Sequence, residues 1–252
     1  MKSLLRDDIA SFDGAGLAVH RVGEGKPLLL LHGLFSDAQT NWIKFGHAAR
    51  LAEAGFEVFM PDLRAHGQSA RPHDPGAYPA DVLARDVAAL VQHYGWTRFD
   101  LAGFSLGART AARCVINGLK PRRLALVGMG LEGLAGWDKR AAFFIDAIDR
   151  FAEVKRGDRA FMAVSFMKTM KVDLVAARLL LQAVADATPD QLVAHLTMPT
   201  LVLCGDDDRD NGSPERLAEL LPDARLQLIP GTHMSSVTKP EMGAALADFF
   251  VA

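Results

Sequence analysis

Short apolar runs alternate with longer amphipathic segments along most of the chain. Several runs are continuously apolar, as expected for strands covered on both faces of a sheet. The predicted strands span residues 17–22, 28–31, 56–60, 99–102, 124–127, 201–204 and 226–229. In the intervening segments apolar residues return every three or four positions, which predicts helices over residues 42–54, 80–94, 106–117, 214–221 and 240–249. The alternation predicts an α/β fold with a mostly parallel, twisted sheet and helices on both faces.

A stretch of about seventy residues, between the strand ending near 127 and the strand starting near 200, has no strand pattern. Its periodicity predicts three helices, over residues 137–155, 159–170 and 172–187. They are interpreted either as a layer packed on the sheet or as a cap over an active site, and one helix can serve both purposes. The expected organisation is a core of residues 1–130 and 191–252, interrupted by a helical cap of residues 131–190.

Composition and charge narrow the classes of function. The chain has 252 residues, of which 50% are hydrophobic, enough for one large domain. Its 28 basic and 30 acidic residues form no long runs, so we expect neither nucleic acid nor a membrane surface as partner. No apolar stretch approaches the roughly 20 residues that span a bilayer. With only Cys114 and Cys204, both in apolar segments, we expect a cytoplasmic protein with reduced thiols. We also expect a monomer or a homodimer.

The pentapeptide Gly103-Phe104-Ser105-Leu106-Gly107 matches the pattern G-x-S-x-G. Alone the match is weak, but a predicted strand leads into it and a predicted helix leads out. This context is typical of the nucleophile elbow, a sharp turn that exposes a reactive serine above the sheet. Ser105 is therefore the candidate nucleophile; the alternative is a serine that only caps the following helix.

A serine hydroxyl needs a base to remove its proton, and the base needs a carboxylate to orient it. Among eight histidines, His233 follows the last predicted strand, and residues 206–210 place four aspartates after the strand at 201–204. Parallel sheets carry their chemistry at this edge, and the order Ser, Asp, His fits the elbow. The acidic run lacks the spacing of a calcium loop, so no metal is expected. The other histidines are assigned structural, surface or helical positions: His20, His32, His47, His66, His73, His93 and His195.

These motifs together resemble the α/β-hydrolase superfamily, near the small carboxylesterases and the cofactor-free haloperoxidase-like enzymes. Residues 205–208, Gly-Asp-Asp-Asp, resemble its G-x-x-D turn, which implies Asp208 as the acid and Asp207 as second choice. Residues 30–35 resemble its strand-HG-x turn. By this resemblance the backbone amides of Leu34 and Leu106 form the oxyanion hole, with that of Phe35 as the alternative donor.

The same resemblance extends to residues 62–69, which are similar to the family's D-x-R-G-x-G-x-S turn. Ala65 stands in place of its first glycine, which leaves the local backbone open. The resemblance also places the inserted cap after the sixth strand of the fold. It implies catalysis without a metal or organic cofactor.

The expected activity is hydrolysis of small to medium esters with an apolar acyl group, through an acyl-enzyme. Aromatic and thioether side chains of the insertion are expected to line the cavity. The predicted substrate-binding residues are Phe35, Phe144, Phe166 and Met170. Basic residues of the insertion offer an alternative, a site for an acidic group: Lys139, Arg140, Lys155, Arg156, Lys168 and Lys171. Two other functions also stay open: carbon-carbon bond hydrolysis of ring-cleavage products, and sensing of a small ligand by a receptor that keeps the triad.

Overall fold

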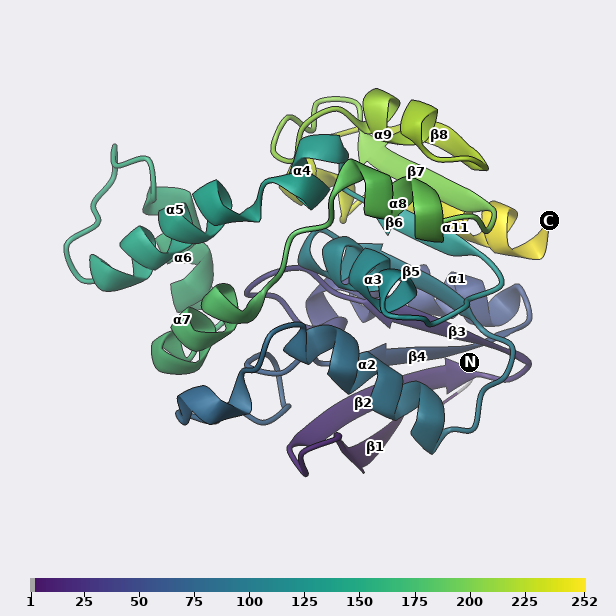
Figure 1. Ribbon diagram of the computed structural model, residues 1–252, viewed down its shortest axis with the longest axis horizontal. Coiled ribbons are helices and arrows are strands. Elements are labelled where there is room, and N and C mark those ends of the chain that lie inside the picture. The colour runs from purple at the N-terminus through teal and green to yellow at the C-terminus, as the bar shows by residue number, and fades with distance from the viewer. Residues whose placement is uncertain (1–2) are drawn as a thin grey trace.

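A computed structural model describes residues 3–252 and shows one eight-stranded sheet in the order β1-β2-β4-β3-β5-β6-β7-β8 (Figure 1). The strands are β1 (Leu5–Ala10), β2 (Gly16–Gly23), β3 (Lys26–Leu31), β4 (Phe56–Pro61), β5 (Asp100–Phe104), β6 (Leu124–Val127), β7 (Thr200–Gly205) and β8 (Ala224–Ile229). From β4 to β8 all neighbours in the sheet are parallel, whereas β2 pairs antiparallel with both β1 and β4. The predicted mostly parallel sheet is confirmed.

The first strand, β1, is absent from the sequence-based prediction. Its sequence LRDDIA carries three charged residues, and only Ile9 of the strand is buried. It lies at the edge of the sheet and pairs with β2 alone. Such a strand is held in place by backbone hydrogen bonds with its neighbour rather than by burial of side chains. Its sequence therefore shows no alternation of apolar and polar residues.

Helices cover both faces of the sheet (Figure 1). The apolar residues of α2 (Val82–His93) and α3 (Leu106–Ile116) belong to one core cluster, and those of α1 (His47–Glu53) and α11 (Pro240–Val251) belong to the other. Consecutive residues of β3 alternate between the two clusters, so both faces of that strand are buried. This double burial explains the continuous apolar runs of the central strands.

Some predicted helices are divided or shortened. The helix expected over 42–54 is a π-helical turn, η1 (Gln39–Ile43), followed by α1 after a break at Gly46. Three short α-helices were missed, α4 (Leu131–Ala135), α8 (Pro189–His195) and α10 (His233–Ser236). The start of α8 was detectable, because Thr188 and Gln191 form a capping box around a proline in the first turn. The remaining short elements are η2 (Pro75–Ala77), which was not predicted, and α9 (Pro214–Leu220), which was.

Between β6 and β7 the chain forms only helices, and three of them project away from the sheet (Figure 1). These are α5 (Trp137–Asp149), α6 (Phe161–Thr169) and α7 (Leu174–Ala183). Side chains from α5 and α6 line the same cavity as Ser105, which follows β5. The projecting helices therefore lie over the carboxyl edge of the parallel strands.

The two cysteines, Cys114 and Cys204, are buried and unbridged. Burial raises the pKa of the Cys204 thiol to about 12, so the thiol stays protonated near neutral pH. Across residues 3–252, none of the helices is both long enough and apolar enough to cross a membrane.

Candidate active site

Ser105 lies on the turn from β5 into α3, with φ 54° and ψ −113°. This backbone conformation is strained for a residue with a side chain, and strain of this kind concentrates at functional sites. A Cβ on Gly103 would overlap the Gly107 carbonyl, and a Cβ on Gly107 would overlap the Leu31 carbonyl. The turn therefore requires both glycines, for the steric reason that the G-x-S-x-G pattern indicated.

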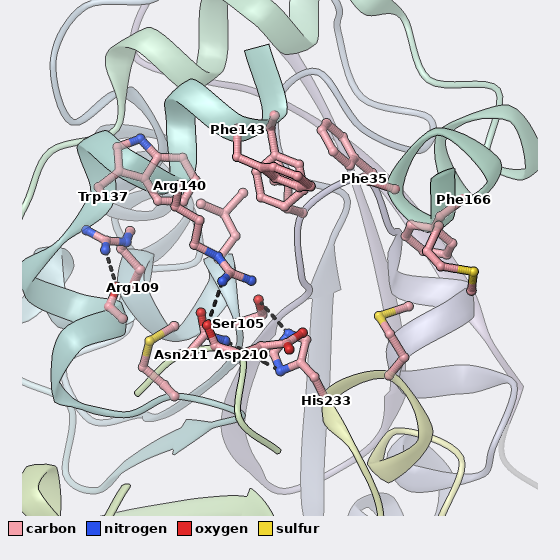
Figure 2. Close-up of a pocket in the computed structure, with 18 of the residues that line it drawn as sticks. Phe35, Ser105, Arg109, Trp137, Arg140, Phe143, Phe166, Asp210, Asn211 and His233 are labelled. Atoms are coloured by element: carbon pink, nitrogen blue, oxygen red, sulfur yellow. Dashed lines mark hydrogen bonds between the residues drawn. The ribbon is translucent and has the colours of Figure 1, made fainter. Parts of the chain in front are cut away.

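The imidazole of His233 bridges Ser105 and Asp208. Figure 2 shows His233 beside Ser105. Its Nε2 lies 3.0 Å from the Ser105 hydroxyl oxygen, and its Nδ1 lies 2.8 Å from Oδ2 of Asp208. Asp208 follows β7 and His233 follows β8, so adjacent parallel strands deliver both residues to one edge. All three side chains are buried.

The carboxylate of Asp208 is held as an anion. Burial raises its pKa, but the hydrogen bond from His233 and the backbone N–H of Asp210 outweigh this effect, and the net pKa is lowered. An ionised Asp208 accepts a hydrogen bond from Nδ1–H of His233, and this tautomer leaves Nε2 free to accept a hydrogen bond from Ser105. Asp207, the second candidate for the acid, is exposed.

Asp208, Asp210 and His233 bring three possible metal-ligand atoms within 4.8 Å of one another. Both imidazole nitrogens of His233 already face hydrogen-bond partners, Asp208 and Ser105. A metal bound here would have to displace one of these contacts. The donor set therefore fits a hydrogen-bonded triad better than a metal site.

Two backbone amides beside Ser105 make no hydrogen bond within residues 3–252, those of Leu34 and Leu106. Leu106 is the first residue of α3, where amides have no partner within the helix. The alternative donor, Phe35, gives its N–H to Nε2 of His66 at 2.9 Å. The structure thus leaves Leu34, rather than Phe35, available to pair with Leu106.

His32 and His66 hold the turn that contains Leu34. Nε2 of His32 accepts the N–H of Leu63 at 2.9 Å, and Nε2 of His66 accepts the N–H of Phe35. Burial lowers the pKa of both imidazoles, that of His66 to about 3, so both remain neutral acceptors near pH 7. Both histidines therefore have a structural role, as expected. The hydrogen bond to His66 helps to keep Phe35 in a left-handed conformation with φ 59°.

His20 was expected at the surface or in a helix, and this was wrong. It lies in β2, is buried, and places Nε2 3.5 Å from Oδ2 of Asp62. The motif around residue 62 explains the position, because Asp62 also accepts the N–H groups of Ala38 and Gln68. His20 therefore supports a buried carboxylate that ties two loops together.

Ala65 occupies a left-handed position, with φ 69°. This explains why the family's turn has glycine there, and how the present chain departs from it without losing the turn. The N–H of Ala65 still closes the loop onto the carbonyl of Ala70 at 3.0 Å.

A cavity of about 690 Å³ opens above Ser105 and His233 (Figure 2). Its walls are mostly apolar and aromatic, and the contributing residues include Leu34, Phe35, Leu106, Met129, Trp137, Phe143, Phe144, Met162 and Phe166. Three of the four predicted substrate-binding residues, Phe35, Phe144 and Phe166, line it. The fourth, Met170, follows the end of α6 and does not line the cavity; its sulfur lies 3.9 Å from the Thr40 hydroxyl.

A second, smaller cavity of about 200 Å³ meets the first at Ser105 and His233. It is lined in part by polar side chains of the loop before α1 and of the segment after α10: Ser36, Thr40, Asn41 and Thr238. Leu34, Phe166 and Met234 border both spaces. The candidate nucleophile therefore lies where a large lobe and a small lobe meet, and the walls of both are mostly apolar.

The family model for the alpha/beta hydrolase fold matches residues 26–191, more than half of the 252-residue chain. The chain belongs to the α/β-hydrolase family. This assignment agrees with the sheet order and with the elbow at Ser105.

Three similar proteins illustrate the range of activities in this family. The chain is 30% identical, over 82% of its length, to the dihydrolipoyllysine-residue acetyltransferase component of an acetoin cleaving system from Pseudomonas putida. It is 25% identical to a non-heme haloperoxidase from Rhodococcus erythropolis, covering 96% of this chain and 98% of that protein. A thermophilic esterase from Thermogutta terrifontis, solved with malate bound, superposes with a TM-score of 0.77 at 25% identity, covering 98% of each chain.

The hydrolase spans only part of some curated relatives. It matches 58% of the length of the Pseudomonas putida acetyltransferase component. The activity of such a longer protein as a whole therefore does not transfer to the present chain.

Two features of the site were not predicted from the sequence. Asn211 donates to the carbonyl of Gly128 at 2.8 Å and lies 3.4 Å from Nδ1 of His233, so it packs against the edge of the imidazole. Phe104 stacks on the same ring, with centroids 4.8 Å apart. Neither contact has a local signal, because each joins segments distant in sequence.

Proposed function

We propose that this α/β-hydrolase is a serine hydrolase that cleaves small to medium carboxylic esters through an acyl-enzyme intermediate. The observation that carries the proposal is the continuous hydrogen-bonded chain from Ser105 through His233 to Asp208. Beside it are two backbone amides that make no hydrogen bond within residues 3–252. Each part of an acyl-transfer site has a residue of suitable chemistry.

In the acylation step, the Ser105 hydroxyl attacks the ester carbonyl while Nε2 of His233 takes its proton. Negative charge develops on the former carbonyl oxygen, and the N–H groups of Leu34 and Leu106 donate to it. The tetrahedral intermediate then expels the alcohol, which receives the proton from Nε2. Asp208 stabilises the transient imidazolium without taking its proton.

In the deacylation step, water takes the place that the alcohol has left and acts as the nucleophile. His233 removes a proton from that water, the oxygen attacks the acyl carbonyl, and the bond to Ser105 breaks as its oxygen regains the proton. The sequence of steps needs no redox chemistry and no organic cofactor. We expect chelators to leave the activity unchanged.

The two lobes at Ser105 separate the two halves of an ester. The large lobe suits the bulkier half and the small lobe suits the shorter half, since the scissile carbonyl must lie where they meet. Methionine and phenylalanine side chains in the large lobe favour loose selection by shape, with one methylene worth roughly 1–3 kcal/mol.

The proposal is tested with purified protein, a graded series of ethyl esters and a phosphonate probe that labels reactive serines. We expect repeated turnover by the unaltered protein and labelling at Ser105, with both lost in Ser105→Ala. Ser235→Ala is the matched control, because Ser235 is a partly buried serine whose hydroxyl takes part in the capping box at Thr232. Undiminished ester turnover by Ser105→Ala would refute the proposal, and labelling without repeated turnover would favour a ligand receptor.

A further inference from the structure

Three arginines line the large lobe: Arg109, Arg140 and Arg159. Arg109 is fully engaged, because its guanidinium pairs with Asp186 at 3.0 Å and donates to the carbonyls of Ala185 and Gly133. Arg159 lies at the rim, with 74% of its side chain exposed and Asp146 3.9 Å away. Neither guanidinium offers a free, enclosed surface to a ligand.

Arg140 differs from both. Its side chain extends from α5 toward Ser105 and Asp210 (Figure 2). Nη1 donates to the backbone carbonyl of Asp210 at 2.7 Å, and no carboxylate of residues 3–252 forms an ion pair with the guanidinium. The remaining N–H groups have no protein acceptor within the described chain.

Charge around Arg140 is incompletely balanced. Burial lowers the pKa of its guanidinium. The negative charges of Asp210 and Asp208, which make no ion pair with it, raise the pKa by less than burial lowers it. Arg64 shows the opposite case, since direct bonds to Asp13 and Asp86 raise its pKa above the ordinary value despite burial. A partly desolvated guanidinium without a carboxylate favours an anionic partner, because forked N–H donors match the two oxygens of a carboxylate.

We propose that Arg140 binds a carboxylate on the substrate, so that the preferred ester has an apolar body ending in a carboxylate. The inference rests on the proposed esterase function, and it favours the acidic-group alternative over the expected apolar acyl group. Aromatic walls bury the body of the ligand, and Phe144 backs the guanidinium, whose carbon lies 5.7 Å from the ring centroid.

Another role for Arg140 is to stabilise the negative charges of Asp208 and Asp210. This role predicts that loss of the guanidinium slows every substrate equally, because Asp208 serves the common chemical step. A carboxylate-binding role predicts a loss confined to carboxylated substrates and expressed mainly in KM. The two roles therefore separate in a comparison of matched esters.

The test uses isosteric pairs in which an isopropyl group replaces the carboxylate. Monoethyl glutarate and ethyl 5-methylhexanoate vary the acyl part, and 4-acetoxybutanoate and 4-methylpentyl acetate vary the alcohol part. We expect kcat/KM to favour the carboxylated member of at least one pair by about 10- to 100-fold, the range of a hydrogen bond to a charged group. The preferred pair identifies which half of the ester occupies the large lobe.

Arg140→Gln should abolish this preference and leave kcat/KM for the neutral esters within about threefold of the original value, whereas Arg140→Lys should restore part of the preference. Lys139→Gln is the control, since it removes the same charge from an exposed neighbour on α5. Melting temperatures of all three variants report on folding.

Equal kcat/KM within both pairs, or equal losses for neutral and carboxylated esters in Arg140→Gln, would overturn the inference and leave the proposed function intact. Failure to turn over any of the four esters would overturn both. A preference that survives in Arg140→Gln would also overturn the assignment.

Discussion

His233 lies beside the nucleophile, whereas His32 and His66 hold the turn that contains Leu34, and the two groups make different hydrogen bonds. In His233, Nε2 faces the Ser105 hydroxyl and Nδ1 faces a carboxylate. In His32 and His66, Nε2 accepts a backbone N–H and Nδ1 contacts a backbone carbonyl. All three rings are buried, so burial alone does not distinguish the two groups.

The difference lies in what each nitrogen is free to do. An imidazole with both nitrogens committed to the backbone cannot accept a proton without breaking a hydrogen bond, and desolvation keeps it neutral. An imidazole between a hydroxyl and a carboxylate can accept a proton and be stabilised afterwards. The first kind shapes the turn beside the nucleophile, and the second kind is suited to move protons.

Removal of the proposed base should have the largest effect. We expect His233→Ala to lower kcat by several orders of magnitude, roughly 10⁶-fold in a comparable triad, and Asp208→Asn to lower it somewhat less. Both variants should keep their far-UV circular dichroism. Steady-state kinetics with a neutral ethyl ester measures the effect, and a His233→Ala protein of near-normal activity would remove the distinction between the two groups.

Removal of His66 should have a moderate effect on catalysis. His66→Ala leaves the N–H of Phe35 without its acceptor and lets the turn holding Leu34 shift, so we expect kcat to fall about 10- to 100-fold with little change in KM. Glutamine can also accept the N–H, so His66→Gln should recover part of the loss. Equal losses in both variants, or a change confined to KM, would contradict a positioning role.

The buried imidazoles of His32 and His66 should also make the free energy of unfolding depend on pH. The folded pKa of His66, about 3, lies below the ordinary value of 6.5. Its contribution is therefore complete above pH 6.5 and is lost as the pH falls toward 3. From pH 7 to pH 5 the loss is about 2 kcal/mol, and His32 adds to it in the same direction. Urea unfolding at both pH values measures this, and His66→Gln should weaken the dependence; an unchanged dependence would count against His66 as its source.

The smallest effect concerns Ala65, in the turn that follows β4. Ala65→Gly removes left-handed strain of about 1–2 kcal/mol, offset by lost burial of one methyl group and a freer unfolded chain. We expect a net gain below about 1 kcal/mol, a rise in Tm of roughly 1–3 °C. Ala70→Gly, at a nearby position without positive φ, should lower Tm; a fall in both variants would show that Ala65 carries no relievable strain.

Sequence patterns were enough to predict most of the parallel sheet, the elbow at Ser105 and the loops that carry Asp208 and His233. These features depend on local rules: strand periodicity, the steric need for glycine around a tight turn, and the shared edge of parallel strands. The edge strand β1 and the short helices α4 and α8 were missed because little apolar patterning marks them.

Which partners meet depends on how the chain packs in three dimensions. The fold gave the N–H of Phe35 to His66, moved Met170 out of the cavity and turned Arg140 into it. Each outcome joins side chains or amides from segments far apart in the chain. Such contacts are set by how helices and loops pack across the sheet edge, and no local pattern of residues encodes that packing.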